Sequence, residues 1–200
     1  MKARDWQRYL ETERKLHGKT VFSVTELANV SGSKPHVLNV ELDRLRKQGI
    51  VVRYAQGRYG LPDVVTPETL LPHLDTQAYL TGVFALHRHN LITQIPAEIT
   101  CFTNRRHNRS RVRTTPVGRF TFVCVQSQVY APPQEGVLAG PGQALCDYVF
   151  LMRRRGLAPA SQVTFRGLHS LDAKAMQEWM TRYPKKVRQT LAEIWAMGLR

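Results

Sequence analysis

The sequence predicts an α+β fold in two domains, residues 1–61 and residues 62–200. In the first domain, apolar residues recur with a helical period as far as residue 49, and a strand-turn-strand pattern follows. In the second domain, prolines punctuate the first residues, and stretches typical of strands and of helices then follow one another in a mixed α/β arrangement. A chain of 200 residues is long enough for two such domains.

Residues 4–16 are expected to form the first helix. Its apolar and aromatic residues recur at helical spacing and should share one face: Trp6, Tyr9, Leu10 and Leu16. Gly18 follows the helix at a position where a left-handed residue commonly ends one.

A short helix is expected to begin after Ser23. Ser23 and Glu26 have the spacing of a capping box, in which each side chain accepts a hydrogen bond from the backbone amide of the other residue. The apolar residues that follow are few: Leu27, Ala28 and Val30. Ser31 and Gly32 interrupt the pattern, so we expect a tight turn there.

A longer helix is expected to follow this turn. Ser33 is predicted to be its N-cap, with Pro35 in the first turn, where a missing N–H costs little. Three leucines recur at i, i+4 and i+7 and predict its buried face: Leu38, Leu42 and Leu45. Gly49 is expected to end the helix.

Beyond Gly49 the pattern changes from a helical one to strand, turn and strand. Residues 50–54 and 58–61 are typical of strands, and residues 55–57 of the turn between them. A short helix, a tight turn, a longer helix and a basic hairpin follow one another in this order. The order resembles the winged helix-turn-helix superfamily, whose longer helix enters the major groove of DNA.

The resemblance makes the start of the longer helix and the hairpin the candidate DNA-binding surface. Its candidate contacts are Ser31, Ser33, Lys34, His36, Asn39, Arg53, Gln56 and Arg58. Asn39 can pair bidentately with adenine, and Lys34 can reach guanine acceptors or a phosphate. The two serines are candidate backbone contacts, and the hairpin residues would reach phosphates or the minor groove. The alternative is an interaction module without DNA contact.

The charge of the chain also favours a polyanionic partner. Its 29 Lys and Arg against 15 Asp and Glu give a formal net charge of +14 and a sequence pI near 10.3. Nucleic acid is the commonest partner of such a protein, because each cation that meets a phosphate releases condensed counterions. Acidic proteins and acidic membranes are the alternatives. The excess is positive in both predicted domains, so the contact surface could extend over both.

Other features of the sequence predict a cytoplasmic protein without a membrane segment. The cysteines are three in number and far apart, which suits reduced thiols better than a disulfide framework. Residues 1–7 are polar and lack the apolar run of a secretory signal, and no stretch has the length of a transmembrane helix.

In the second domain, residues 62–73 are expected to form a linker or first loop. A helix is expected from Asp75 or Thr76 to His89, with Asn90 as the left-handed residue after it. The remaining expected strands are 98–103, 119–125, 128–131 and 163–165, and the remaining expected helices are 139–154, 172–182 and 185–197. Trp179, Leu191, Ile194 and Trp195 are expected in the core.

Four short motifs carry a resemblance to a known family. They are Tyr-Leu-Thr-Gly at 79–82, Ala-Leu-His-Arg-His-Asn-Leu at 85–91, Gln-Ile-Pro at 94–96 and Ala-Leu-Cys-Asp at 144–147. With the preceding helix-turn-helix pattern, the chain resembles the AbiEi-like antitoxins of abortive-infection (type IV) toxin-antitoxin systems. The resemblance implies an antitoxin-like second domain, a repressor that binds inverted repeats at its own operon, and a partner toxin of nucleotidyltransferase type.

Residues 104–113 are unusually basic. Five arginines lie within this segment and are candidate contacts for phosphate or for an acidic partner: Arg105, Arg106, Arg109, Arg111 and Arg113. On a strand, Arg109, Arg111 and Arg113 would share one face at intervals of about 6.6 Å, close to the spacing of phosphates along a nucleic-acid strand. A solvated loop is the alternative.

The sequence offers no catalytic, metal or cofactor site. His87 and His89 lie at i and i+2 and would point to opposite sides of a helix, and the cysteines lack a C-x-x-C spacing. Residues 136–142 contain glycines but no P-loop motif, and the acids form no pair suited to hydrolysis. We therefore expect a DNA-binding regulator and not an enzyme. The alternative function is an antitoxin or RNA-binding module that acts mainly through the basic second domain.

Overall fold

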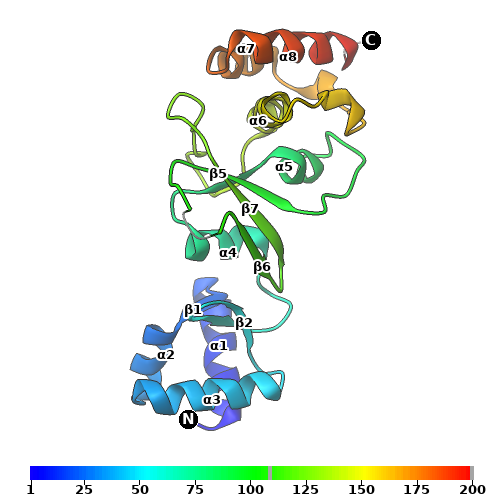
Figure 1. Cartoon of the computed structure of the whole chain (residues 1–200). Helices are drawn as coiled ribbons and strands as arrows, with labels where there is room; N and C mark the ends of the chain where they lie inside the picture. The colour runs from blue at the N-terminus through cyan, green and yellow to red at the C-terminus, as the bar shows by residue number, and fades with distance from the viewer. Residues whose placement is uncertain (108–109, 199–200) are drawn as a thin grey trace. The chain divides into compact units, whose positions relative to one another are not determined.

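The computed structural model describes residues 1–107 and 110–198, and the α+β class predicted from the sequence is confirmed (Figure 1). The chain divides into two compact units. The first unit comprises Met1–Thr76 with Thr115–Gly118, and the second unit comprises the other residues. Each unit has its own cluster of buried hydrophobic residues.

Four helices and one small sheet make up the first unit. The elements are α1 (Ala3–His17), β1 (Val21–Ser23), α2 (Val24–Ser31), α3 (Pro35–Lys47), β2 (Val52–Ala55), β3 (Arg58–Gly60) and α4 (Pro67–Leu74). The sheet is antiparallel with the order β1-β3-β2, so the β2–β3 hairpin is extended by a strand from before α2. The predicted helices at α1, α2 and α3 and the predicted hairpin are confirmed.

The core of the first unit lies between α1, α2 and α3. It is built from the expected leucine stripe of α3 together with side chains from the other elements: Trp6, Leu10, Phe22, Leu27, Leu38, Leu42, Leu45, Val51 and Leu61. Trp6 also donates a hydrogen bond from Nε1 to Glu41 Oε1 of α3 at 2.8 Å. Leu16 was expected on the same face but is 71% exposed. It lies about 80° around the helix from Trp6, in the last turn of α1.

The ends of the helices agree with the sequence in most places. Gly18 and Gly49 have the left-handed backbone expected after α1 and α3, with φ of 65° and 71°. The prediction of Ser33 as the N-cap of α3 is wrong. Lys34 occupies that position without a side-chain hydrogen bond, because Pro35 is already the first helical residue.

The segment predicted to be a linker contains α4 instead. Thr66 Oγ1 accepts a hydrogen bond from the amide of Thr69 at 3.3 Å, and Pro67 begins the helix where its missing N–H is not needed. Leu70 and Leu71 are fully buried, which explains why the segment folds despite Pro72 near its end. The structure groups this segment with the first unit, whereas the sequence assigned it to the second domain.

A four-stranded mixed sheet and a group of helices make up the second unit. The elements are β4 (Tyr79–Thr81), α5 (Gly82–Arg88), β5 (Ile99–Thr103), β6 (Val112–Thr115), β7 (Gly118–Cys124), α6 (Pro141–Arg154), α7 (Ala173–Thr181) and α8 (Lys185–Gly198), with 3₁₀ turns at Pro159–Ser161 and Leu168–Ser170. The sheet order is β4-β5-β7-β6, antiparallel between β4 and β5 and parallel between β5 and β7. α6 packs against α5, α7 and α8 (Figure 1).

Two predictions in the second unit are wrong. The helix expected from residue 75 or 76 begins only at Gly82, because residues 79–81 pair with β5 and are buried as a strand. Residues 128–131 do not form a strand, and the amides of Val129 and Tyr130 instead donate to Gln126 O in a turn. The left-handed backbone expected at Asn90 is confirmed, with φ of 58°.

The other expected elements of the second unit are confirmed within two residues of their predicted ends, apart from residues 163–165. There, only Phe165 forms a β-bridge, with Ile92. Leu191 and Ile194 lie in the core as expected, and Trp179 and Trp195 are partly buried against it. In the described ranges, no helix is both long enough and apolar enough to cross a membrane.

Candidate nucleic-acid interface

The two sides of α3 differ sharply in burial. Its leucine stripe faces the core, whereas the leading polar residues Lys34, His36 and Asn39 are all exposed. None of these three side chains is used to close the core. They therefore remain accessible to an external partner. Residues that read base edges must be accessible in this way.

The turn between α2 and α3 is held by Ser31. Its hydroxyl donates to Ala28 O at 3.3 Å and accepts a hydrogen bond from the amide of Ser33 at 3.2 Å. Gly32 has a φ of 64° and ends α2. Ser31 and Ser33 are both half-buried, and the hydrogen bond between the Ser33 amide and the Ser31 hydroxyl holds the turn that precedes α3.

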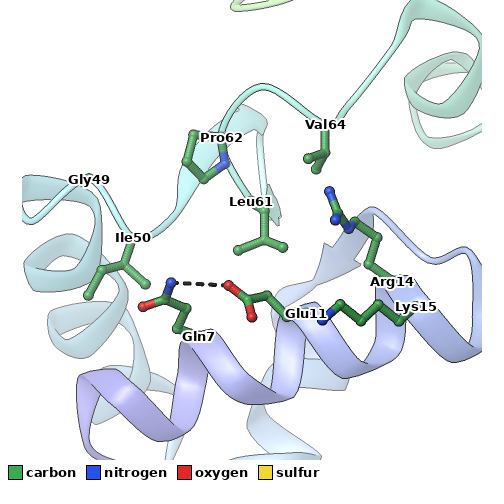
Figure 2. Close-up of a pocket in the computed structure, with 9 residues that line it drawn as sticks. All are labelled: Gln7, Glu11, Arg14, Lys15, Gly49, Ile50, Leu61, Pro62 and Val64. Atoms are coloured by element: carbon green, nitrogen blue, oxygen red, sulfur yellow. Dashed lines mark hydrogen bonds between the residues drawn. The ribbon is translucent and has the colours of Figure 1, made fainter.

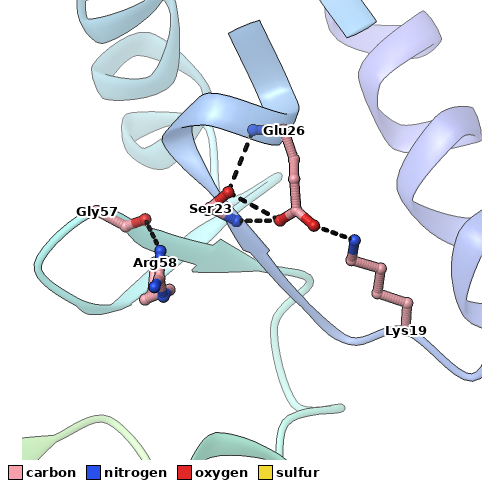
Figure 3. A network of polar contacts seen from close by, with 5 residues as sticks. All are labelled: Lys19, Ser23, Glu26, Gly57 and Arg58. Carbon is pink, nitrogen blue, oxygen red and sulfur yellow. Dashed lines mark hydrogen bonds and ion pairs between the residues drawn. The ribbon is translucent and has the colours of Figure 1, made fainter. Parts of the chain in front are cut away.

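A capping box anchors the start of α2, as predicted. Ser23 donates its amide to Glu26 Oε2 at 2.7 Å, and Glu26 donates its amide to Ser23 Oγ at 3.1 Å (Figure 3). Lys19 forms an ion pair with the other carboxylate oxygen. Partial burial opposes ionisation, yet the hydrogen bonds from Lys19 and Ser23 outweigh it and lower the pKa of Glu26 to about 2.

The hairpin is tied to the same end of α2. The amide of Val24 donates to Gly57 O in the β2–β3 turn at 3.1 Å. Gly57 has a φ of 65°, which favours glycine at this position of the turn. The start of α2 and the tip of the hairpin are thus held together by the backbone.

The three predicted contacts on the hairpin lie in different environments. Arg53 and Gln56 are exposed, and Arg53 makes a hydrogen bond of 3.4 Å to Ala55 O. Arg58 is half-buried and donates to Gly57 O at 3.4 Å (Figure 3). Burial and, after it, the positive charge of Arg58 lower the pKa of His73 in α4. Arg53 is therefore the better placed of the two arginines for an external anion.

A hollow of about 350 Å³ lies between α3 and the hairpin. Its lining residues are Val24, Asn39, Asp43, Arg46, Arg53, Gly57 and Tyr59. Two residues predicted from the sequence, Asn39 and Arg53, thus meet at one site. Asp43 and Arg46 were not singled out, although they lie four and seven residues after Asn39 and so share its side of the helix. Asp43 pairs with Arg46 at 2.7 Å and with Lys47 at 2.9 Å.

A second, larger hollow of about 480 Å³ lies beside α1. It is lined by Gln7, Glu11, Arg14, Lys15, Gly49, Ile50, Leu61, Pro62 and Val64 (Figure 2). Gln7 Nε2 donates to Glu11 Oε1 at 3.1 Å inside it. Its charged groups are of both signs, and none of the predicted contacts lies in it. It is therefore not a candidate site for the predicted contacts.

The arginine-rich segment is described only in part, so the row of Arg109, Arg111 and Arg113 stays a prediction. Arg109 lies outside the described residues, and Arg111 precedes β6, which begins at Val112. Arg113 lies on the strand but is half-buried, with Cζ 5.1 Å from the centre of the Phe122 ring. Among the described arginines of the segment, Arg105, Arg106 and Arg111 are exposed and accessible to a partner.

A buried polar cluster in the second unit was missed by the sequence reasoning. Asp147 of α6 is fully buried and accepts hydrogen bonds from Thr81 Oγ1 at 2.7 Å and from the Tyr183 hydroxyl at 2.6 Å. Burial, partly offset by these hydrogen bonds, raises the pKa of Asp147 to about 7. All of Ala144, Leu145, Cys146 and Asp147 are buried, so this motif belongs to the core and not to the surface. The sequence feature that could have indicated this cluster is an acidic residue within an apolar helical stretch, because a buried acid needs hydrogen-bond partners.

The chain matches no model of a known protein family, and no curated protein shows significant similarity to it.

Proposed function

We propose that the chain is a DNA-binding transcriptional regulator and that its first unit is a winged helix-turn-helix. In this proposal α2 and α3 are the helix-turn-helix, and the β2–β3 hairpin is the wing. The observation that carries it is the surface of α3: Lys34, His36 and Asn39 are exposed on a helix whose other side is buried. A helix of this kind fits the major groove of B-DNA and presents its leading residues to base edges.

Charge and packing support the same reading. The formal net charge of +14 favours binding to phosphate. Arg53 lines the same hollow as Asn39, so it could contact a phosphate next to the groove that α3 enters. The hydrogen bond between Val24 and Gly57 fixes the wing relative to α2, and the hydrogen bonds of Ser31 fix the turn from α2 to α3, so both contact elements are ordered before binding. A regulator of this kind acts in the cytoplasm.

Asn39→Ala and Arg53→Ala are expected to weaken binding in different ways. The test duplex carries the inverted repeat upstream of the gene, and a scrambled duplex is the reference. Asn39→Ala should cost about 1–3 kcal/mol on the specific duplex only, because an amide can read a base edge. Arg53→Ala should weaken both duplexes and reduce the slope of log affinity against log salt by about 1. Titrations at several salt concentrations measure both effects.

Lys15→Ala is the matched control, since it removes an exposed cation of α1 outside the proposed surface. It should leave affinity for both duplexes close to that of the unaltered protein. Equal affinity of the unaltered protein for the specific and the scrambled duplex would contradict sequence-specific regulation.

We also propose, from the motifs at 79–96 and 144–147, that the regulator opposes a partner toxin of nucleotidyltransferase type. The exposed Arg105, Arg106 and Arg111 in the second unit supply a surface for an acidic partner. Co-expression of the chain with a toxin gene that neighbours its own gene should restore growth, and Arg105→Glu with Arg106→Glu should reduce the rescue while leaving affinity for DNA unchanged. No rescue by the unaltered chain would contradict the antitoxin role without affecting the regulator.

A further inference from the structure

An exposed apolar pair on α3 lies outside the hydrophobic core of the first unit. Val37 is 48% and Val40 is 73% exposed. Val40 lies about 200° around the helix from Leu38, on the side opposite the buried stripe. β-Branched residues are also poorer helix formers than alanine, so neither the core nor helix propensity explains valine there.

The surroundings of Val40 are polar and mainly cationic. His36 lies one turn before it, and Lys47 lies two turns after it on the same side of α3. Asp43, one turn after Val40, pairs with Arg46 and Lys47. Val40 is therefore a small apolar site on a charged surface. A stable protein interface needs an area on the order of 1,000 Å² or more, far beyond one or two valines.

Among the bases in the major groove of DNA, thymine alone presents an apolar group, its 5-methyl. We propose that Val40, assisted by Val37, contacts thymine methyl groups and makes the protein prefer A·T pairs under the middle of α3. This inference rests on the proposed function, since it requires α3 to enter the groove. Asn39 lines the hollow beside the hairpin and Val40 faces directly away from the core, so the two residues would read different base pairs.

The test replaces thymine with deoxyuridine in the half-sites, which removes the 5-methyl groups and keeps base pairing. The unaltered protein should bind the deoxyuridine duplex about fourfold more weakly for each methyl group contacted, the loss expected for one buried methyl-sized group. Val40→Ala should bind the thymine duplex more weakly and should show a smaller deoxyuridine penalty than the unaltered protein, because Val37 and the shorter alanine keep only part of the methyl contact. Leu16→Ala, which shortens an exposed residue of α1, should bind as the unaltered protein does and keep the full deoxyuridine penalty.

Val40 is exposed and alanine favours helix, so the variant should melt at the same temperature as the unaltered protein. An equal deoxyuridine penalty in Val40→Ala and in the unaltered protein, or no penalty in either, would overturn the inference while leaving DNA binding intact. Failure of the unaltered protein to distinguish the thymine duplex from a scrambled one would instead overturn the proposed function, and the inference with it.

Discussion

Asp147→Ala is expected to destabilise the second unit by about 2–6 kcal/mol, because each buried hydroxyl that loses its partner costs about 1–3 kcal/mol. The two hydroxyls are those of Thr81 in β4 and Tyr183 between α7 and α8. Their shared acceptor connects the edge of the sheet to the C-terminal helices. Denaturant unfolding followed by the fluorescence of Trp179 and Trp195, which pack against this core, measures the loss.

Asp147→Asn provides the control and a test of the raised pKa. The fold disfavours the ionised carboxylate, so the free energy of unfolding should fall as pH rises from about 4, the ordinary pKa of the group, to about 7. Below this window both states are protonated, and above it the cost of ionisation is constant. The asparagine variant keeps a neutral group of the same shape and should lack this component. Parallel pH profiles of the two proteins between pH 4 and pH 8 would contradict the assignment.

Local signals in the sequence predicted the elements that depend on local chemistry. The capping box of Ser23 and Glu26 and the leucine stripe of α3 were correct, since each is fixed by residues within one or two turns. β1 was missed because three residues carry no readable alternation, and the strand exists only by pairing with β3. Residues 79–81 were predicted to be helical because their apolar residues have helical spacing. Pairing with β5 makes them a strand instead.

The candidate site was predictable to a similar degree. The exposure of His36 and Asn39 follows from their phase relative to the leucine stripe. Lys34 shares the phase of Leu38 and is exposed because it is the N-cap, before the first helical turn. Helical phase also places Val40 outside the core, on the side of α3 opposite the stripe. The cluster at Asp147 includes Thr81 and Tyr183, which lie 66 and 36 positions away along the chain. No local sequence pattern predicts contacts between residues so far apart.

Leu42→Ala is expected to destabilise the first unit by about 2–5 kcal/mol, the usual cost of truncating a buried leucine. Leu42 is buried in the middle of the stripe, and the core cluster that contains it consists only of residues of the first unit. Amide hydrogen exchange should therefore lose protection in α1–α3 more than in α6. Leu16→Ala should change stability by no more than about 0.5 kcal/mol, as for most surface positions. Equal loss of protection in α6 would contradict the separation into two cores.

The same variant separates folding from recognition. Leu42 is buried and cannot touch a base, so at a temperature where the variant remains folded its ratio of affinities for specific and scrambled duplex should match that of the unaltered protein. Near the melting temperature of the first unit, affinity for both duplexes should fall together, because the folded fraction multiplies both. Asn39→Ala should behave in the opposite way, changing the ratio at every temperature and leaving the melting temperature unchanged. A changed ratio in folded Leu42→Ala would mean that the core residues of α3 set its specificity through its position in the groove.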